Sequence, residues 1–385
     1  MPKLLRLGIA GLGAASRQIL AVRSGVIELA AAADIRPAAC EEFQKKYGRV
    51  AFPTVEALCQ SDIDAVWIAT PNVFHAEHTV IAAQCGKHII VEKPMAVTLE
   101  EAERMVTAAK RHRVKLLQGH SKIYGPALRK MREVVASGRL GRVIQINSWN
   151  SNDWLQRPRL ASEIDTKIGG GVCMRQGPHQ ADIVRYLGGG LVRSLRAITG
   201  RADPNFSTEG DYTVLMEFDT GAAATMVFNG YGYFDAAELT WGIGEGGRRL
   251  DEAQASAPKS RLAGAVDQQT KYKSPRSTEE RAGRARNAQS FFGLTIVACE
   301  RGTIRQSPQG LFVYTERGRQ EIACPPDPGR AAELQELQEA IEQDRAPFPD
   351  GRWGKATLEV CLAMLQSSHE RREIALSHQV ASPDF

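Results

Sequence analysis

Several features that would place this chain of 385 residues in other classes of protein are missing. No apolar stretch reaches the roughly 18 residues that a membrane-spanning helix needs. The start, residues 1–6, runs straight into a strand-like pattern and has no apolar signal region. These absences predict no membrane partner and favour a cytoplasmic location. The composition, 43% hydrophobic and 24% charged, is that of a globular chain, and the length indicates two domains.

Cysteine pairs and base-stacking aromatics are missing as well. The seven cysteines are scattered and contain no CxxC pair, which predicts neither a disulfide framework nor a zinc site, and we expect no metal. Residues 245–290 hold ten Lys/Arg against six Asp/Glu, most of the net charge of +5. Without interleaved aromatic residues, this polar and basic excursion, residues 242–290, is typical of a solvated surface, and we expect no nucleic-acid partner.

What is present begins with a regular alternation of strand and helix patterns over the first 120 residues. The strand-like runs are residues 5–10, 27–33, 63–69, 88–91 and 114–118, and the helical ones are 14–22, 37–47, 75–85 and 99–111. Thr98 followed by Glu101 resembles a capping box for the last of these helices. The alternation predicts the α/β class, with residues 1–122 forming a doubly wound parallel sheet of the Rossmann type.

The pattern changes after residue 120. Residues 126–136 look helical, 143–149 look like a strand, and 211–231 contain two strand-like runs joined by the turn Asp219-Thr220-Gly221. We therefore expect a second α/β domain, residues 123–385, with a large, open, mostly antiparallel sheet. Helical patterns at 330–344 and 355–371 are expected near the domain junction. Apolar residues on both faces of the 211–231 strands favour an oligomer, which the family resemblance given below implies to be a homodimer or homotetramer; they include Val214, Leu215, Met216 and Phe218.

A glycine-rich turn, Gly11-Leu12-Gly13-Ala14-Ala15-Ser16, follows the first strand. It fits a GxGxxG fingerprint with Ser16 in place of the third glycine, and predicts that the backbone approaches a pyrophosphate. Asp34, at the end of the second strand, can accept hydrogen bonds from ribose hydroxyls. Asp34 repels a 2′-phosphate and favours NAD, whereas Arg36 can stack on adenine or accept that phosphate, so NADP stays open.

Two further groups of residues are candidates for catalysis or substrate binding: one follows a predicted strand, and the other follows a run of glycines. Lys93, in Glu92-Lys93-Pro94, comes directly after a strand, where ligands of parallel sheets collect, and is the first catalytic candidate. The glycines at 169–171 are followed by Arg175, Pro178, His179 and Asp182. His179 can present its imidazole from a first helical turn, although a hydrogen-bonded core histidine is an equal interpretation. Asp182 can orient it or be an ordinary helix carboxylate.

In order and spacing, the segments GIAGLGAAS, AVWIATPNVFH, VEKP and GGGVCMRQGPHQADIVRYLGG resemble the Gfo/Idh/MocA family of NAD(P)-dependent oxidoreductases. The resemblance implies that Lys93 and His179 lie at the reacting carbon. It also implies cofactor contacts, to which we add the intervening turn residues and Arg36. The expected cofactor set is Gly11, Gly13, Ala14, Ala15, Ser16, Asp34, Arg36, Thr70, Pro71, Asn72, His75, Glu92 and Lys93.

Arg175 stands where many members of that family carry an aspartate. A guanidinium there favours a carboxylate-bearing substrate over a neutral polyol. Together with Asp182, Arg157 and Trp154, it forms the expected substrate set, although Arg157 and Arg159 are equally typical of structural ion pairs. The element RQGPHQ, the length and the polar insertion look most similar to the branch with phthalate cis-dihydrodiol dehydrogenases.

The predicted function is therefore dehydrogenation of a cyclic, carboxylate-bearing diol, a small-molecule substrate. The hydride passes to the nicotinamide and the proton to Lys93 or His179. A sugar, inositol or other polyol dehydrogenase, an NAD-dependent hydrolase and a non-catalytic dinucleotide sensor remain alternatives.

Overall fold

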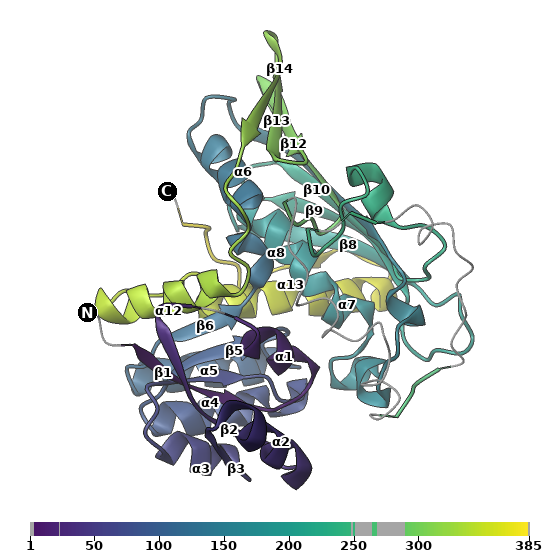
Figure 1. Cartoon of the computed structure of the whole chain (residues 1–385). Coiled ribbons are helices and arrows are strands. Elements are labelled where there is room, and N and C mark those ends of the chain that lie inside the picture. Colours follow the sequence, from purple (N-terminus) through teal and green to yellow (C-terminus); the bar gives the residue numbers. More distant parts are fainter. Residues whose placement is uncertain (1–3, 23, 248, 251–263, 268–288, 384–385) are drawn as a thin grey trace. The chain divides into compact units, whose positions relative to one another are not determined.

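The computed structural model describes residues 4–22, 24–247, 249–250, 264–267 and 289–383 (Figure 1). They form two compact units: the first contains 4–121 and 329–358, and the second contains 359–383 and the described residues of 122–328. Most of the excursion expected at 242–290 lies outside the described residues. Among the residues described, no helix has the length and apolar character needed to cross a membrane.

The first unit is built on a six-stranded sheet of order β3-β2-β1-β4-β5-β6, in which all pairs are parallel. Its strands are β1 (Leu5–Ala10), β2 (Ile27–Ala33), β3 (Val50–Phe52), β4 (Ala65–Ile68), β5 (His88–Glu92) and β6 (Leu116–Gly119). Its helices are α1 (Ala14–Leu20), α2 (Pro37–Tyr47), α3 (Val55–Gln60), α4 (His75–Gln84), α5 (Leu99–Arg111) and α12 (Ala331–Glu342), with the 3-10 turn η1 (Asn72–Phe74). This order confirms the predicted doubly wound Rossmann sheet. The chain adds strands outwards from β1 to β3 on one side and then crosses back to add β4, β5 and β6 on the other, so the strand order reverses between β1 and β4.

Alternation along β1 explains how the helices are divided between the two faces of this sheet. Leu7 and Ile9 are buried in one apolar cluster with Leu334 and Leu337 of α12. Gly8 points the other way, where an added Cβ would lie 2.9 Å from the side chain of Ile63. Because successive strand residues face opposite sides, α12 covers one face of the sheet and the segment after α3 covers the other.

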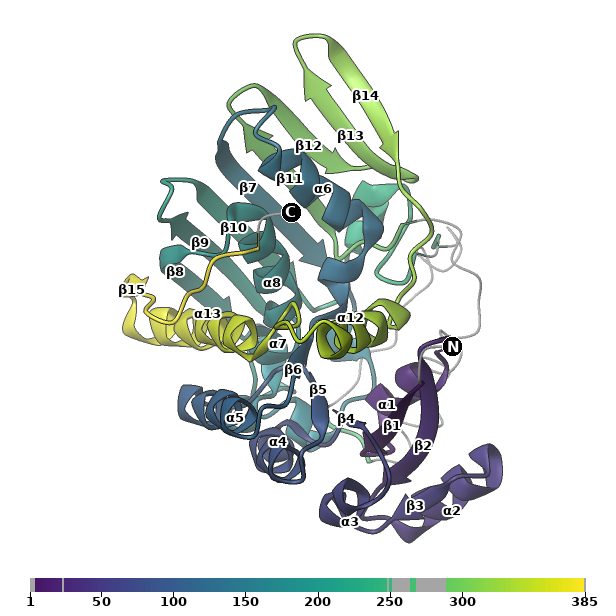
Figure 2. The ribbon, with the colours of Figure 1, turned by 90° about the vertical axis from the view of Figure 1, so that its left-hand side faces the viewer.

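The second unit contains a nine-stranded sheet of order β14-β13-β12-β11-β7-β10-β9-β8-β15 among the described residues (Figure 2). Its strands are β7 (Val143–Ser151), β8 (Val192–Gly200), β9 (Asp211–Phe218), β10 (Ala223–Asn229), β11 (Leu294–Cys299), β12 (Gly302–Gln306), β13 (Gly310–Thr315), β14 (Gly318–Ala323) and β15 (Ile374–Ala375). All pairs are antiparallel except β10 with β7, which confirms the predicted mostly antiparallel sheet.

Helices line one face of this second sheet. They are α6 (Pro126–Ala136), α7 (Gly171–Arg175), α8 (Gly177–Gly188) and the later part of α13 (Gly351–Glu370), with 3-10 turns η2 (Ser121–Tyr124), η3 (Trp154–Gln156), η4 (Ala161–Glu163), η5 (Thr166–Ile168) and η6 (Ala236–Thr240). In Figure 2, α6 and α8 cross in front of the strands. Met131 of α6, Val184 of α8 and Met364 of α13 share one core with Ile146 of β7 and Met226 of β10.

The predicted hairpin at Asp219-Thr220-Gly221 joins β9 and β10, and Gly221 takes the left-handed conformation, with φ +80°. Burial alternates along β9. Val214 and Met216 are buried, whereas Leu215 between them is 55% exposed. The strands therefore carry apolar side chains on both faces, as predicted: Val214, Met216 and Phe218 face the core, and Leu215 lies on the open face.

Candidate active site

The glycine turn after β1 requires glycine at its first position. Gly11 has φ +91°, and a Cβ there would lie 2.8 Å from the carbonyl oxygen of Ala69, just after β4. The chain can therefore pass from β1 into α1 only without a side chain at this point. Ser16, in place of the third glycine, is buried and donates its hydroxyl to the carbonyl of Gly13, 2.8 Å away. Ser16 supports the turn from inside.

Asp34 lies beside this turn and is held by four hydrogen bonds. Oδ2 accepts from the backbone N–H of Leu12 at 2.8 Å, and Oδ1 accepts from that of Arg36 at 2.9 Å. The guanidinium of Arg36 donates to both oxygens, at 2.8 and 2.9 Å. Burial raises the pKa of Asp34, but the bonds from Arg36 and Leu12 outweigh it, so the pKa lies below its ordinary value. The carboxylate is ionised, and ribose hydroxyls would have to exchange with the Arg36 side chain.

His75 links the turns that follow β4 and β5. Its Nδ1 lies 2.9 Å from the carbonyl oxygen of Pro94, and its Nε2 lies 2.9 Å from that of Thr70. The ring is 1% exposed, and burial lowers its pKa. Thr70 also contacts Nδ1 of His78 through its hydroxyl, at 2.9 Å. Both histidines therefore brace the turn of Thr70, Pro71 and Asn72.

Glu92 ends β5 at the same edge of the sheet, and Lys93 follows it. Glu92 pairs in register with Gly119 of β6, and its carboxylate is 2.9 Å from Nη1 of Arg330. Lys93 is half-buried and begins the turn that Pro94 continues. The carboxyl ends of β1, β4 and β5 thus bring the glycine turn, the Thr70 turn and Lys93 to one edge.

This edge fits a dinucleotide. A turn that requires glycine at its first position, an ionised acid at the end of β2 and the reversal of strand order between β1 and β4 are the features such a cofactor uses. All three are present in the first unit.

In the second unit, the glycines before α8 make close contact with the chain itself. A Cβ on Gly171 would lie 2.2 Å from Oε1 of Glu209, and one on Gly170 would lie 2.6 Å from the backbone nitrogen of Asp165. Glu209 in turn accepts a hydrogen bond from the N–H of Cys173, at 3.0 Å. Neighbouring loops thus occupy the space on the Cβ side of Gly170 and Gly171, which explains why glycine is needed at both positions.

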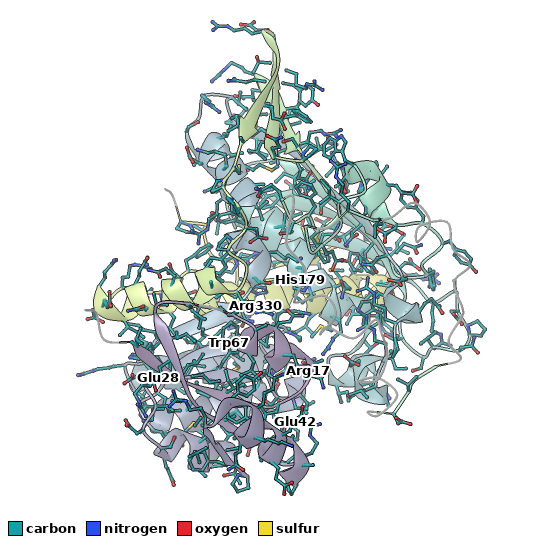
Figure 3. All side chains as sticks on the ribbon, in the orientation of Figure 1. Arg17, Glu28, Glu42, Trp67, His179 and Arg330 are labelled. Carbon is teal, nitrogen blue, oxygen red and sulfur yellow. The ribbon has the colours of Figure 1, made fainter. Side chains whose placement is uncertain are left out.

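α8 presents His179 from its first turn, as predicted, since the helix begins at Gly177 with Pro178 in that turn. The ring of His179 lies 5.1 Å from the ring of Phe292, measured between centroids, and Nζ of Lys122 lies 5.8 Å from the same Phe292 ring. His179 is half-buried, and its side chain is labelled in Figure 3. The imidazole is thus partly exposed at the start of α8, and Phe292 is a neighbour that it shares with the side chain of Lys122.

Asp182, one turn further along α8, is only 1% exposed. Its charge acts on Arg185, a fully buried residue whose pKa is lowered to about 10 by burial against the opposing effect of Asp182. Arg185 also donates to Oε1 of Gln379 at 2.8 Å. The burial of Asp182 beside this cation favours a structural role, and contact with substrate stays a prediction.

Two of the arginines expected near the substrate have acidic partners. Nε of Arg157 lies 2.7 Å from Oδ1 of Asp153, and Nη2 of Arg175 lies 2.9 Å from Oε1 of Glu163. Burial lowers the pKa of Arg157, but Asp153 and Glu245 outweigh it and the net pKa is raised. Both guanidinium groups are thus already compensated within the chain.

Arg159 is different. Its Nε donates to the carbonyl oxygen of Trp154 at 3.0 Å, and its guanidinium carbon lies 4.2 Å from the centre of the buried Trp154 ring. Across the described ranges, no carboxylate lies within ion-pair distance of it. Burial, together with the charges of Arg157 and Arg175 and against that of Glu163, lowers its pKa to about 9. Arg159 is therefore a cation at neutral pH with capacity for an external anion.

Sequence reasoning gave Arg159 less weight than Arg175, and it did not consider Glu163 or Arg330. The only signal for Arg159 was its place in the run Arg157-Pro158-Arg159. Nothing in the sequence indicated which arginine has an acidic partner.

Comparison with known proteins adds an independent result. Residues 5–120 match a model described as an oxidoreductase family with an NAD-binding Rossmann fold, and residues 128–243 match the GFO/IDH/MocA C-terminal domain. The chain is 35% identical to the 1-carboxy-3-chloro-3,4-dihydroxycyclohexa-1,5-diene dehydrogenase of Comamonas testosteroni over 378 residues, 94% of each chain.

Solved structures agree. A putative dehydrogenase from Bordetella bronchiseptica RB50 is 36% identical, with a TM-score of 0.86 over 97% of this chain and 100% of that one. An oxidoreductase from Agrobacterium radiobacter, solved with NAD+, L-tartaric acid and magnesium, is 18% identical, with a TM-score of 0.71 over 97% and 98% of the two chains. The latter likeness concerns the fold alone.

Proposed function

The chain belongs to the GFO/IDH/MocA family of NAD-binding oxidoreductases, and from this premise we propose that it oxidises a secondary alcohol of a cyclic diol bearing a ring carboxylate. The proposal is supported by the Comamonas relative, whose printed name describes a carboxylated dihydroxycyclohexadiene as the compound it dehydrogenates.

Arg159 is the observation that carries the substrate class. A guanidinium stacked on Trp154 presents several N–H donors in one plane, which suits a carboxylate. Arg157 and Arg175 add positive potential, while their own bonds go to Asp153 and Glu163. A neutral polyol has no charge to pair with Arg159, so a carboxylate-bearing ring is favoured over a sugar or inositol.

Residues of the first unit would hold NAD. The backbone of the turn from Gly11 to Ser16, with Ala14 and Ala15, would bind the pyrophosphate, and Asp34 would accept hydrogen bonds from the ribose hydroxyls. The turn of Thr70, Pro71 and Asn72 lies at the same edge of the sheet. Arg36 would stack on adenine after its guanidinium exchanges its bonds to Asp34 and Leu12. Bound NAD supplies a hydride acceptor at C4 of the nicotinamide.

The proton of the substrate hydroxyl passes to Lys93 or His179, the candidate bases of the two units. The carbon that loses its hydride becomes a ring ketone. In a dihydroxycyclohexadiene this ketone tautomerises to an aromatic catechol, which drives the reaction towards oxidation.

A second copy of the chain is the proposed protein partner. The register across the open face of the second sheet aligns a mostly apolar row of side chains: Ile198, Thr213, Val227, Trp149 and Leu294. Ile198 is 63% exposed and Trp149 is 48% exposed. An apolar row spanning five strands is typical of a surface that another subunit covers, so we propose a homodimer or homotetramer. The expected cytoplasmic location stays a prediction.

The test is a substrate panel with purified protein and NAD or NADP. It includes cis-dihydrodiols of cyclohexadiene with and without a ring carboxylate, inositol, and sugar acids. We expect NADH and a catechol product, identified by NMR, from the carboxylated dihydrodiol. Efficient turnover of inositol would favour a polyol dehydrogenase, and product formation without net NADH would favour an NAD-dependent hydrolase. Binding of NAD without turnover of any compound would favour a dinucleotide sensor.

A further inference from the structure

Arg330, the residue before α12, forms a buried cluster with the end of β5. Its Nη1 lies 2.9 Å from Oε1 of Glu92 and 3.0 Å from Oε2 of Glu333. Its guanidinium carbon lies 5.4 Å from the centre of the Trp67 ring in β4 (Figure 3). The exposed fractions of the side chains are 12% for Arg330, 7% for Glu92 and 0% for Glu333. One guanidinium therefore compensates two carboxylates that water barely reaches.

The cluster matters because Glu92 directly precedes Lys93. The side chain of Glu92 is fixed by Arg330, and its backbone is fixed by pairing with Gly119 of β6. On the other side of Lys93, the carbonyl of Pro94 is fixed by the buried ring of His75. Lys93 thus starts from a short segment that is anchored on both sides.

Arg330 and Glu333 do not contribute equally to this anchor. Burial, reinforced by the charge of Glu92 and opposed by that of Arg330, raises the pKa of Glu333 to about 7. Nη1 of Arg330 donates to both carboxylate oxygens of Glu333, at 3.3 and 3.0 Å, so Glu333 holds the guanidinium from within α12, whereas Glu92 belongs to β5 itself. On this basis the contact between Arg330 and Glu92 supports the turn, and the contact with Glu333 holds Arg330 in place.

We propose that Arg330 is a positioning residue for the oxidoreductase reaction, which acts through Glu92 to fix the Glu92-Lys93-Pro94 turn and thereby the Lys93 amine. This inference rests on the proposed role of Lys93. The residue before α12 would then act on the turn after β5, although the two segments are far apart in the sequence.

Hydrogen exchange on the protein without cofactor tests the anchor independently of activity. In Arg330→Met, we expect the backbone amides of residues 88–97 to exchange at least about tenfold faster, because a buried carboxylate is left uncompensated. The matched control is Arg345→Met. It removes a salt bridge near the other end of α12, in which Nη1 of Arg345 lies 2.5 Å from Oε1 of Glu336. Unchanged exchange in folded Arg330→Met, or equal acceleration in the control, would overturn the proposal.

Turnover provides the second readout. We expect kcat of Arg330→Met to fall roughly 10- to 100-fold with little change in the Kd of NAD, since small displacements of a catalytic group have effects of this size. Arg330→Lys keeps the positive charge but lacks the planar guanidinium group. Its kcat should lie between those of Arg330→Met and wild type. Glu333→Gln and Arg345→Met should stay within about threefold of wild type.

Three kinetic results contradict the proposal: wild-type kcat in Arg330→Met, a loss confined to KM, or a loss in Glu333→Gln as large as that in Arg330→Met. If Arg330→Met does not fold, hydrogen exchange and kcat are compared between Arg330→Lys and Glu333→Gln instead. If the wild-type protein forms no NADH from any diol, the proposed function fails, while the exchange experiment still decides the role of Arg330.

Discussion

Replacing Arg159 by methionine should weaken the binding of an anionic substrate without destabilising the fold. A hydrogen bond between charged groups contributes about 1.5–3 kcal/mol. Its loss corresponds to a rise in KM of roughly 10- to 150-fold for a carboxylated dihydrodiol. The same diol without the carboxylate should show little change, because it never engaged the guanidinium.

The stability of the variant follows from the pKa of Arg159. A pKa lowered from 12.5 to about 9 sets an upper limit of about 5 kcal/mol on the cost of holding this cation in the fold. Because Arg159 is partly exposed, solvent screens most of this, and about 1 kcal/mol is a realistic figure. The loss of the stacking contact with Trp154, about 0.5–1 kcal/mol, offsets it. Arg159→Met should therefore melt within about 3 °C of wild type.

Arg175→Met is the matched control. It removes the cation that pairs with Glu163, whose side chain is only 9% exposed, and leaves a nearly buried carboxylate without that ion pair. A cost of about 2–3 kcal/mol and a fall in Tm of roughly 5–10 °C are expected. The contrast between the two variants follows directly from which arginine has an acidic partner.

The pH dependence has a definite sign. The folded pKa of Arg159 lies below its unfolded value, so its unfavourable contribution to stability is present below pH 9 and is relieved as pH rises through about 9. Anion binding needs the cation, so the KM of the carboxylated diol should rise above that pH in wild type and not in Arg159→Met. Steady-state NADH formation and thermal melts measure both effects. An unchanged KM in Arg159→Met, or equal losses for charged and uncharged diols, would refute the reasoning.

Four other predictions use simpler assays. Lys93→Ala should bind NAD normally by calorimetry yet lose nearly all turnover, and normal turnover would exclude Lys93 as the base. Asp34→Ser should raise the KM of NAD about tenfold or more and reduce the preference for NAD over NADP. An unchanged ratio of kcat/KM for the two cofactors would contradict this. Gly171→Ala should destabilise the second unit by about 2–4 kcal/mol, since its Cβ would lie 2.2 Å from Glu209 at φ +79°, whereas Gly25→Ala, with no atom within 4 Å, should not; equal melting of the two would be the contrary result. Ile198→Lys should reduce the molar mass measured by light scattering to that of one chain. An unchanged molar mass would exclude the open sheet face as the subunit interface.

The first unit could be predicted from the sequence because its signals are local. Gly48 ends α2 in the left-handed conformation, with φ 63°. The hydroxyl of Thr98 accepts from the N–H of Glu101 at 3.1 Å, as the capping pattern indicated. Gly11 is required by both its φ and its neighbours. In a βαβ fold, such turns and caps recur every few residues, so each element can be inferred from its own segment.

The second unit was less predictable because strands such as β14 depend on their neighbours. β14 has the sequence GRQEIA and lies at the edge of its sheet, and all of its residues but Ile322 are exposed. A polar edge strand carries no alternation that sequence reasoning can use. Short strands such as β12 form through pairing with β11 and β13, which the local sequence does not reveal.

For the site, the sequence offers candidate residue types but not their pairing. That Arg157 and Arg175 contact a substrate stays a prediction. Glu163 pairs with Arg175 and leaves Arg159 on Trp154, a choice made by the folded loop. The contact of Arg330 with Glu92 joins segments remote in the chain, and one sequence offers no sign of it.

The most direct measurement is the ratio of kcat/KM for two substrates of the wild-type protein with NAD: a cis-dihydroxycyclohexadiene carboxylate and the same diol without the carboxylate. Our account predicts NADH formation from the first and a ratio of at least about tenfold in its favour. A ratio near one, or NADH formation only from neutral polyols, would contradict the account.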